Sequence, residues 1–215
     1  MEAKPPTYEQ TCSNVDYYAV LDFEATCDNK FRIRPQEIIE FPTVLIDAYT
    51  LEPISEFQTY VRPIHNPTLS AFCNELTGIQ QEWVDVAPNF TEALELHRQW
   101  MDAQGLLPSQ GKEVLFVTCG DWDLRQMLPA QCKLTETNIP SYFQEWVNIK
   151  DIFCRRWSTD KKMGMAGMLR KSDLVLEGRH HSGIDDCKNI GRLLIQLCKD
   201  GCSISATSRA KQKKG

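Results

Sequence analysis

Residues 17–25, YYAVLDFEA, join a run of aromatic and apolar side chains to two carboxylates. The run predicts a buried β-strand, and side chains two positions apart in a strand point to the same face, so Asp22 and Glu24 would project side by side. Two carboxylates at that spacing raise each other's pKa unless a cation lies between them, and this segment contains no Lys or Arg. The pair favours a Mg²⁺ or Mn²⁺ site, while a solvent-exposed strand end or an arginine from a distant segment would also explain it.

The rest of the chain shows strand patterns that alternate with helical patterns. Further strands are expected at 38–48, 54–63 and 113–120 and at the start of 147–157. Helices are expected at 68–76, 80–85, 89–101, 122–132, 140–146, 163–171 and 185–199, with one more inside 147–157. The first three strands would form an antiparallel meander. We therefore expect an α/β fold with a mixed five-stranded sheet, three antiparallel strands plus parallel ones, flanked by helices.

One predicted helix, residues 89–101, places a histidine among core side chains. Phe90, Ala93, Leu94 and His97 recur at the spacing of one helical face. We expect His97 to pack at the rim of the core and to have no part in the chemistry.

A second pair of acids follows the apolar segment 113–120, in TCGDWDLRQML (118–128). Aspartate is a favourable helix cap, and Asp121 is the natural one. Asp123 would lie near the carboxyl end of the strand, where α/β sheets commonly place ligands. We expect one cap and one ligand, although helix capping alone would explain the pair equally well.

The stretch GRHHSGIDD, residues 178–186, contains two histidines and two aspartates. Counted from Asp186 at helical spacing, the following residues are Ile and Leu, whereas those counted from Asp185 are polar. Asp186 is therefore the inward ligand and Asp185 the cap. His181 lies five residues before Asp186, and a loop histidine can take a proton from water. We interpret His180 as a bystander.

Together these stretches resemble the DEDDh exonucleases of the RNase H-like superfamily. Three motifs occur in order, as DFEAT (22–26), GDWDL (120–124) and HSGIDD (181–186). The Eri-type branch, with the histone-mRNA 3′-end exonuclease and Snipper-like proteins, is closer still. Its motifs match at EIIEFP (37–42), YVRP (60–63), LTGI (76–79) and GRHHSGIDDCKNI (178–190), although the branch often has proline at 180. The resemblance covers residues 15–203 and implies an RNase H-like fold.

The resemblance implies hydrolysis of RNA from its 3′ end to nucleoside 5′-monophosphates, with DNA as a further substrate. Two Mg²⁺ ions, replaceable by Mn²⁺, would be bound by Asp22, Glu24, Asp123 and Asp186. Glu24 and His181 would be catalytic, with His181 as the general base. The residues implied to contact the nucleic acid are Glu24, Ala25, Leu76, Thr77, Trp122 and His181.

Two other functions remain open. The chain would be a non-catalytic nucleic-acid-binding or protein-interaction module if it had kept only the fold, although all five motif residues are present. An RNase H-type endonuclease shares the acidic metal chemistry. Cleavage of a circular substrate would identify it.

Charge and cysteine content bear on partners and location. The net charge of −5 argues against a simple polycation, but residues 148–171 hold seven Lys or Arg against two acids and would follow a phosphate backbone. Nine cysteines without CxxC spacing, and no apolar h-region, lead us to expect an intracellular protein, cytoplasmic or nuclear and not secreted. No apolar run reaches 18 residues, so no membrane partner is expected. We expect a flexible N-terminal tail at 1–14, the exonuclease domain at 15–203 and a basic tail at 204–215.

Overall fold

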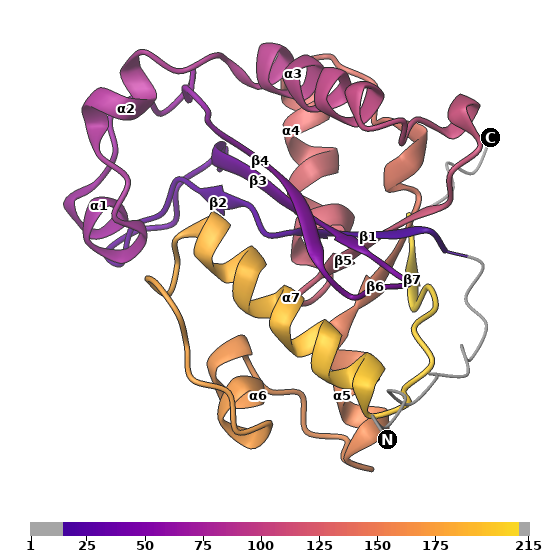
Figure 1. The fold of residues 1–215 in the computed structure, drawn as a ribbon. Helices are drawn as coiled ribbons and strands as arrows, with labels where there is room; N and C mark the ends of the chain where they lie inside the picture. The colour runs from indigo at the N-terminus through magenta and orange to yellow at the C-terminus, as the bar shows by residue number, and fades with distance from the viewer. Residues whose placement is uncertain (1–14, 211–215) are drawn as a thin grey trace, which may run out of the picture.

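One mixed β-sheet runs through residues 15–210, the part of the chain that the computed structural model describes (Figure 1). The strands are β1 (Tyr17–Leu21), β2 (Glu24–Ala25), β3 (Ile38–Asp47), β4 (Pro53–Tyr60), β5 (Val114–Thr118), β6 (Glu145–Asn148) and β7 (Ser208–Arg209). Their order is β2-β3-β1-β5-β6-β7, with β4 also paired to β3. β3 is antiparallel to β1 and β4, whereas β1, β5 and β6 are parallel neighbours. The predicted mixed sheet is confirmed, and the two-residue strands β2 and β7 add to the five that were expected.

Helices cover both faces of this sheet (Figure 1). They are α1 (Ala71–Thr77), α2 (Gln81–Asp85), α3 (Phe90–Ala103), α4 (Leu128–Leu134), α5 (Ile149–Arg156), α6 (Met165–Lys171) and α7 (Gly183–Lys199). Single turns of 3₁₀-helix occupy Pro108–Gln110 and Ser141–Phe143, and a π-helical turn occupies Asp123–Met127. In β1, Ala19 and Leu21 pack with α3 and α4, whereas Tyr18 and Val20 pack with α5, α6 and α7. The alternation of a strand thus builds two cores, one on each face.

The helix predicted at 89–101 is confirmed as α3. Asn89 forms the N-cap, and its side chain and that of Glu92 make a reciprocal capping box. His97 is fully buried and stacks on Phe41 with ring centroids 4.6 Å apart. Its Nε2 lies 3.1 Å from the hydroxyl of Thr43. His97 therefore lies inside the core, deeper than the rim that the helical pattern indicated.

The helix predicted at 140–146 is wrong at its C-terminal end. A 3₁₀ turn stops at Phe143, and Trp146 lies in β6 opposite Phe116. Trp146 is fully buried, and its indole N–H donates to Asp121 Oδ1 at 3.0 Å. A long-range sheet contact of this kind overrides the helical signal of a short segment.

The segment expected to be a basic C-terminal tail begins inside the folded domain. Ile204 and Ser208 are buried, and β7 pairs antiparallel with β6. The Ser208 hydroxyl donates to Asp121 Oδ1 at 2.6 Å. The predicted tail at 1–14 and residues 211–215 lie outside the described residues.

Two further observations concern the described residues alone. Among them, no helix combines the length and apolar character needed to cross a bilayer. Their eight cysteines carry free thiols.

Candidate active site

A break between β1 and β2 positions the first two carboxylates. The register of β1 on β3 continues as far as Glu24, opposite Glu40, before it shifts by one residue at Ala25, and in that register Asp22 falls opposite Pro42. Proline has no N–H, so the ladder is interrupted there. The next N–H, that of Phe23, donates instead to Asp123 Oδ1 at 2.9 Å. The single strand predicted at 17–25 is therefore interrupted at Asp22, and Glu24 resumes the pairing on the far side of the break.

The N-terminus of α7 approaches this break closely enough to require a glycine. A Cβ on Gly183 would lie 2.8 Å from the carbonyl oxygen of Asp22. The helix start is held by Glu40 of β3, whose carboxylate accepts the N–H groups of Gly183 at 2.9 Å and Ile184 at 3.2 Å. Acidic groups are favourable at a helix N-terminus. The first turn of α7 therefore carries Asp186 toward Asp22.

Three carboxylates meet at this point. Oxygens of Asp22, Glu24 and Asp186 lie within 4.8 Å of one another. Burial and then the charges of Asp186 and Glu40 raise the pKa of Glu24 to about 9. Burial also raises the pKa of Asp186 to about 7, and burial followed by the charge of Asp123 raises that of Asp22. A buried group of like charges is unfavourable unless a cation joins it.

The hydrogen bonds of Asp186 support the same conclusion. Oδ2 accepts the N–H of His181 at 3.0 Å, whereas Oδ1 is buried without a hydrogen-bond partner. A buried carboxylate oxygen without a hydrogen-bond partner needs another interaction that compensates for its lost hydration. Three hard oxygen donors around one point fit Mg²⁺ or Mn²⁺.

Asp123 lies beside this cluster without joining it. It begins the π-helical turn, is 4% exposed and faces the same pocket, but it is not among the three residues whose oxygens converge. Burial raises its pKa to about 6, while the N–H of Phe23 acts in the opposite direction. One oxygen is therefore fixed by the backbone of the broken strand. The role of Asp123 as a fourth metal ligand stays a prediction.

His181 faces the carboxylates from the loop before α7. Its φ of +67° lies in the left-handed region, where its N–H reaches Asp186. The ring stacks on that of His180 with centroids 4.0 Å apart, and ring nitrogens of both histidines lie within 4.8 Å of an Asp186 oxygen. Burial and then the neighbouring His180 lower the pKa of His181. A neutral imidazole can accept a proton. His180 lines the same pocket, which a bystander would not be expected to do.

The pocket around these groups has a volume of about 330 Å³. Ala25, Leu76 and Trp122, three residues implied to contact substrate, lie in its wall. Thr77 does not: its hydroxyl is buried, donates to the Cys73 carbonyl at 2.8 Å and accepts from the Ile79 N–H at 3.1 Å. The structure thus gives the Thr77 hydroxyl two partners at the end of α1, and its contact with substrate stays a prediction.

The two aspartates interpreted as helix caps have other partners. The Asp121 carboxylate binds Trp146 and Ser208 and so joins the turn after β5 to β6 and β7. The Asp185 carboxylate accepts the Arg179 N–H at 2.8 Å within the loop. Both capping predictions are wrong, and for Asp185 the reason is that α7 begins at Gly183 and is capped from β3.

Sequence reasoning missed Glu40 and Met165. Glu40 is 1% exposed, and burial raises its pKa against the lowering effect of its hydrogen bonds. An acid inside an otherwise apolar strand was the available signal, because a buried carboxylate requires partners. Met165 lines the pocket from α6, and nothing local in its sequence indicates this.

The known proteins that this chain resembles are exonucleases. The sequence matches the exonuclease family RNase_T over residues 19–194. It is 45% identical over 193 residues to ERI1 exoribonuclease 3 of Homo sapiens, a match covering 90% of this chain and 57% of the relative. It is 38% identical over 204 residues to the 3′-5′ exonuclease Snipper of Drosophila melanogaster, covering 89% and 72%.

A solved structure agrees with the sequence matches. The nuclease domain of 3′hExo, a DEDDh family member, bound to rAMP, superposes with a TM-score of 0.87 at 36% identity, covering 92% of this chain and 98% of that one. The predicted RNase H-like fold is confirmed. The chain spans less than two thirds of the length of the ERI1 exoribonuclease 3 that it matches.

Proposed function

The chain belongs to the RNase_T exonuclease family, and from this premise we propose that it is a 3′→5′ exonuclease that hydrolyses RNA from a free 3′ end, with DNA as a further substrate. The observation that carries the proposal is the convergence of Asp22, Glu24 and Asp186 in a pocket that also contains His181. Both the charge of this cluster and the unpartnered oxygen of Asp186 favour a cation.

DEDDh exonucleases use divalent metal ions, and we propose two Mg²⁺ ions here, with Mn²⁺ able to replace them. The residues proposed to hold them are Asp22, Glu24, Asp123 and Asp186. When bound, such a pair stabilises the attacking and the leaving oxygen of a phosphodiester displacement. Four carboxylates against two divalent ions leave the pocket near neutral, so that an anionic phosphate can approach.

The protein's own side chains carry out the proton transfer that the reaction requires. His181 takes a proton from a water molecule, whose oxygen forms a new bond to the phosphorus of the terminal nucleotide. The bond from that phosphorus to the 3′ oxygen of the preceding nucleotide breaks, and this oxygen leaves as a hydroxyl after gaining a proton from solvent. The products are a nucleoside 5′-monophosphate and a chain one nucleotide shorter. The lowered pKa of His181 supports the proton-accepting role, because it keeps the ring neutral at physiological pH.

The terminal nucleotide would occupy the pocket beside Ala25, Leu76 and Trp122. Leu76 and Trp122 are half-buried in the pocket wall and offer apolar surface to a base. His180, stacked on His181, restricts the orientation of the proposed base.

The test is digestion of a 5′-labelled single-stranded RNA with Mg²⁺, using wild type, His181→Ala and His180→Ala. We expect a ladder that shortens from the 3′ end with wild type and His180→Ala and disappears with His181→Ala. Cleavage of a circular RNA would support an endonuclease. Absence of cleavage of both RNA and DNA by wild type would support the non-catalytic binding module.

We also propose an intracellular location, cytoplasmic or nuclear. The eight free thiols of the described residues support it, because reduced cysteines are typical of those compartments. Fractionation of cells that express a tagged chain would test this location.

A further inference from the structure

A second pocket, of about 550 Å³, adjoins the active-site pocket and shares Gln36 and Trp122 with it. Its wall contains Arg32, Arg34 and Lys133, all exposed. Within residues 15–210, no carboxylate forms an ion pair with these three side chains. Three cations without an ion pair therefore line a hollow next to the site of the proposed reaction.

We propose that this second pocket, together with the loop 27–36, binds the single-stranded segment of nucleic acid upstream of the 3′-terminal nucleotide. The inference rests on the proposed function, which places the 3′ end in the adjoining pocket. A strand whose last nucleotide lies against Trp122 would pass from one pocket into the other across the residues that they share. Its phosphates would meet Arg32, Arg34 and Lys133, whose charge complements the backbone.

The loop also carries an exposed aromatic ring. Phe31 is 65% exposed and stands between Lys30 and Arg32 in the sequence NKFRIRP. Basic groups combined with an exposed aromatic ring are typical of surfaces that bind single strands, because every base has a face that can stack. A base paired within a duplex does not offer that face. Phe31 therefore favours a single-stranded occupant.

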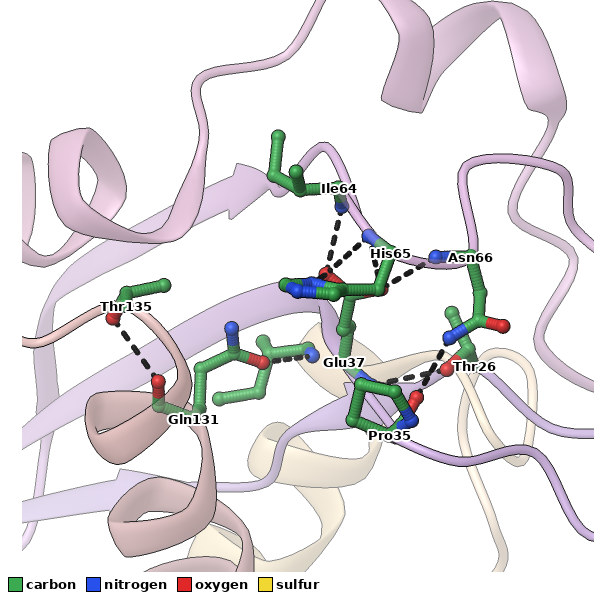
Figure 2. Close-up of polar contacts among 9 residues, drawn as sticks. Thr26, Pro35, Glu37, Ile64, His65, Asn66, Gln131 and Thr135 are labelled. Carbon is green, nitrogen blue, oxygen red and sulfur yellow. Dashed lines mark hydrogen bonds and ion pairs between the residues drawn. The ribbon is translucent and has the colours of Figure 1, made fainter.

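Hydrogen bonds close the two ends of this loop on each other (Figure 2). The Thr26 N–H donates to the Glu37 carbonyl at 2.9 Å, and the Glu37 N–H donates to the Thr26 hydroxyl at 3.0 Å. Gln36 Nε2 adds a bond to the Thr26 carbonyl at 3.0 Å. The base of the loop is thus a short ladder, and Arg32 and Arg34 extend from a fixed support.

Two neighbouring segments hold the same support (Figure 2). The buried Glu37 carboxylate accepts the N–H groups of residues 64–66 at 2.7–3.1 Å, and Asn66 Nδ2 donates to the Pro35 carbonyl at 2.8 Å. Gln131 Oε1 of α4 accepts the Ile38 N–H at 2.8 Å. Because α4 also carries Lys133, this bond fixes the position of Lys133 relative to the loop. A preorganised surface loses less conformational entropy when a strand binds.

The basic segment 148–171, which the sequence indicated as the backbone-binding region, is less available. Arg156 pairs with Asp200 at 3.0 Å, and Lys162 pairs with Asp151 at 2.6 Å. Part of its charge is therefore neutralised within the fold. A matched control lies outside both basic regions, where Arg98, Lys112 and Lys188 are exposed.

The test compares two triple variants that lose the same charge. The pocket variant is Arg32→Ala/Arg34→Ala/Lys133→Ala, and the control variant is Arg98→Ala/Lys112→Ala/Lys188→Ala. Fluorescence anisotropy in EDTA would measure the affinity of each for a single-stranded RNA of about 20 nucleotides, a length that exceeds the site sizes of single-strand binders, over a series of salt concentrations. For the pocket variant we expect the slope of log affinity against log salt to fall in magnitude by about 2, since each phosphate contact contributes about 0.7. The control variant should keep the wild-type slope.

A second readout uses catalysis. We expect the ratio of kcat/KM for the long RNA to that for a dinucleotide to fall about tenfold in the pocket variant, in proportion to the lost contacts. Phe31→Ala should weaken binding of the long RNA by about tenfold without changing the salt slope, whereas Tyr49→Ala, an aromatic residue 81% exposed elsewhere, should not weaken it.

Each result separates the inference from the proposed function. A pocket variant that keeps both the salt slope and the length ratio, or a control variant that loses them instead, would overturn the inference. Failure of the proposed function has a different signature, because wild type would then cleave neither substrate while the binding measured in EDTA still reports on the pocket. Thermal unfolding of both variants would show that each is folded.

Discussion

Glu24→Gln should make the metal-free protein more stable while it removes the activity. Burial and the charges of Asp186 and Glu40 raise the pKa of Glu24 from 4.5 to about 9. A group whose pKa is higher in the folded state contributes stability that is present below pH 4.5 and lost as the pH rises toward 9. At pH 7.5 the loss reaches about 4 kcal/mol, from three pH units at about 1.4 kcal/mol each.

Glutamine has the same shape and no charge, so the substitution removes this loss. We expect the free energy of unfolding in EDTA at pH 7.5 to rise by about 2–4 kcal/mol, and Tm to rise by about 5–10 °C for a chain of this size. At pH 5 the difference should shrink to about 1 kcal/mol, because this pH lies only about half a unit above the unfolded-state pKa of 4.5. Mg²⁺ should stabilise wild type and have little effect on Glu24→Gln.

The assay is urea and thermal unfolding of wild type and Glu24→Gln, with EDTA or Mg²⁺, at both pH values. Glu75→Gln is the matched control, since it makes the same charge change at an exposed position on α1 and should stay within about 0.5 kcal/mol of wild type. A Glu24→Gln protein that is less stable than wild type in EDTA at pH 7.5 would refute the reasoning. So would a gain that does not depend on pH.

Three further substitutions test other parts of the structure. Burial lowers the pKa of His97 from 6.5 to about 3. Below pH 6.5, the unfolding free energy of wild type should therefore fall by about 1.4 kcal/mol per pH unit relative to that of His97→Gln. Urea titrations of both proteins between pH 6 and 4.5 would measure this difference. Asp121→Ala leaves two donors without their acceptor and should cost about 1–3 kcal/mol, with an unchanged response of Tm to Mg²⁺ and partial recovery in Asp121→Asn. Gly183→Ala sets a methyl group 2.8 Å from the Asp22 carbonyl, so it should cost about 1–3 kcal/mol and weaken the stabilisation by Mg²⁺, a result that an unchanged Mg²⁺ titration would contradict.

The local sequence pattern was sufficient to predict those features that depend on interactions between residues close in the sequence. Asn89 and Glu92 form a capping box within one turn, so the start of α3 can be read from adjacent residues. The inward direction of Asp186 follows from the apolar stripe of its own helix, and the structure buries it at 4% exposure. The motif residues themselves, from Asp22 to His181, were identifiable because their order along the chain carries the family resemblance.

Local pattern was not sufficient for residues whose interaction partners lie far away in the sequence. Trp146 became part of a strand because β5 lies beside it, and Asp121 became an anchor for β6 and β7 because their donors reach it. Two of the three hydrogen-bond partners of Glu40 lie 143 and 144 residues away, at the start of α7. No local periodicity encodes a contact over such a separation.

The sequence by itself therefore determined the alternation of strands and helices, the faces on which Asp22, Glu24 and Asp186 lie and the family to which the chain belongs. Only the tertiary structure decided that Pro42 interrupts the strand at Asp22, that Gly183 brings α7 against that break, and that loop 27–36 and α4 line one cationic pocket. The physical reason is that side-chain direction is set within a few residues by the backbone period, whereas the approach of two segments depends on packing across the whole sheet.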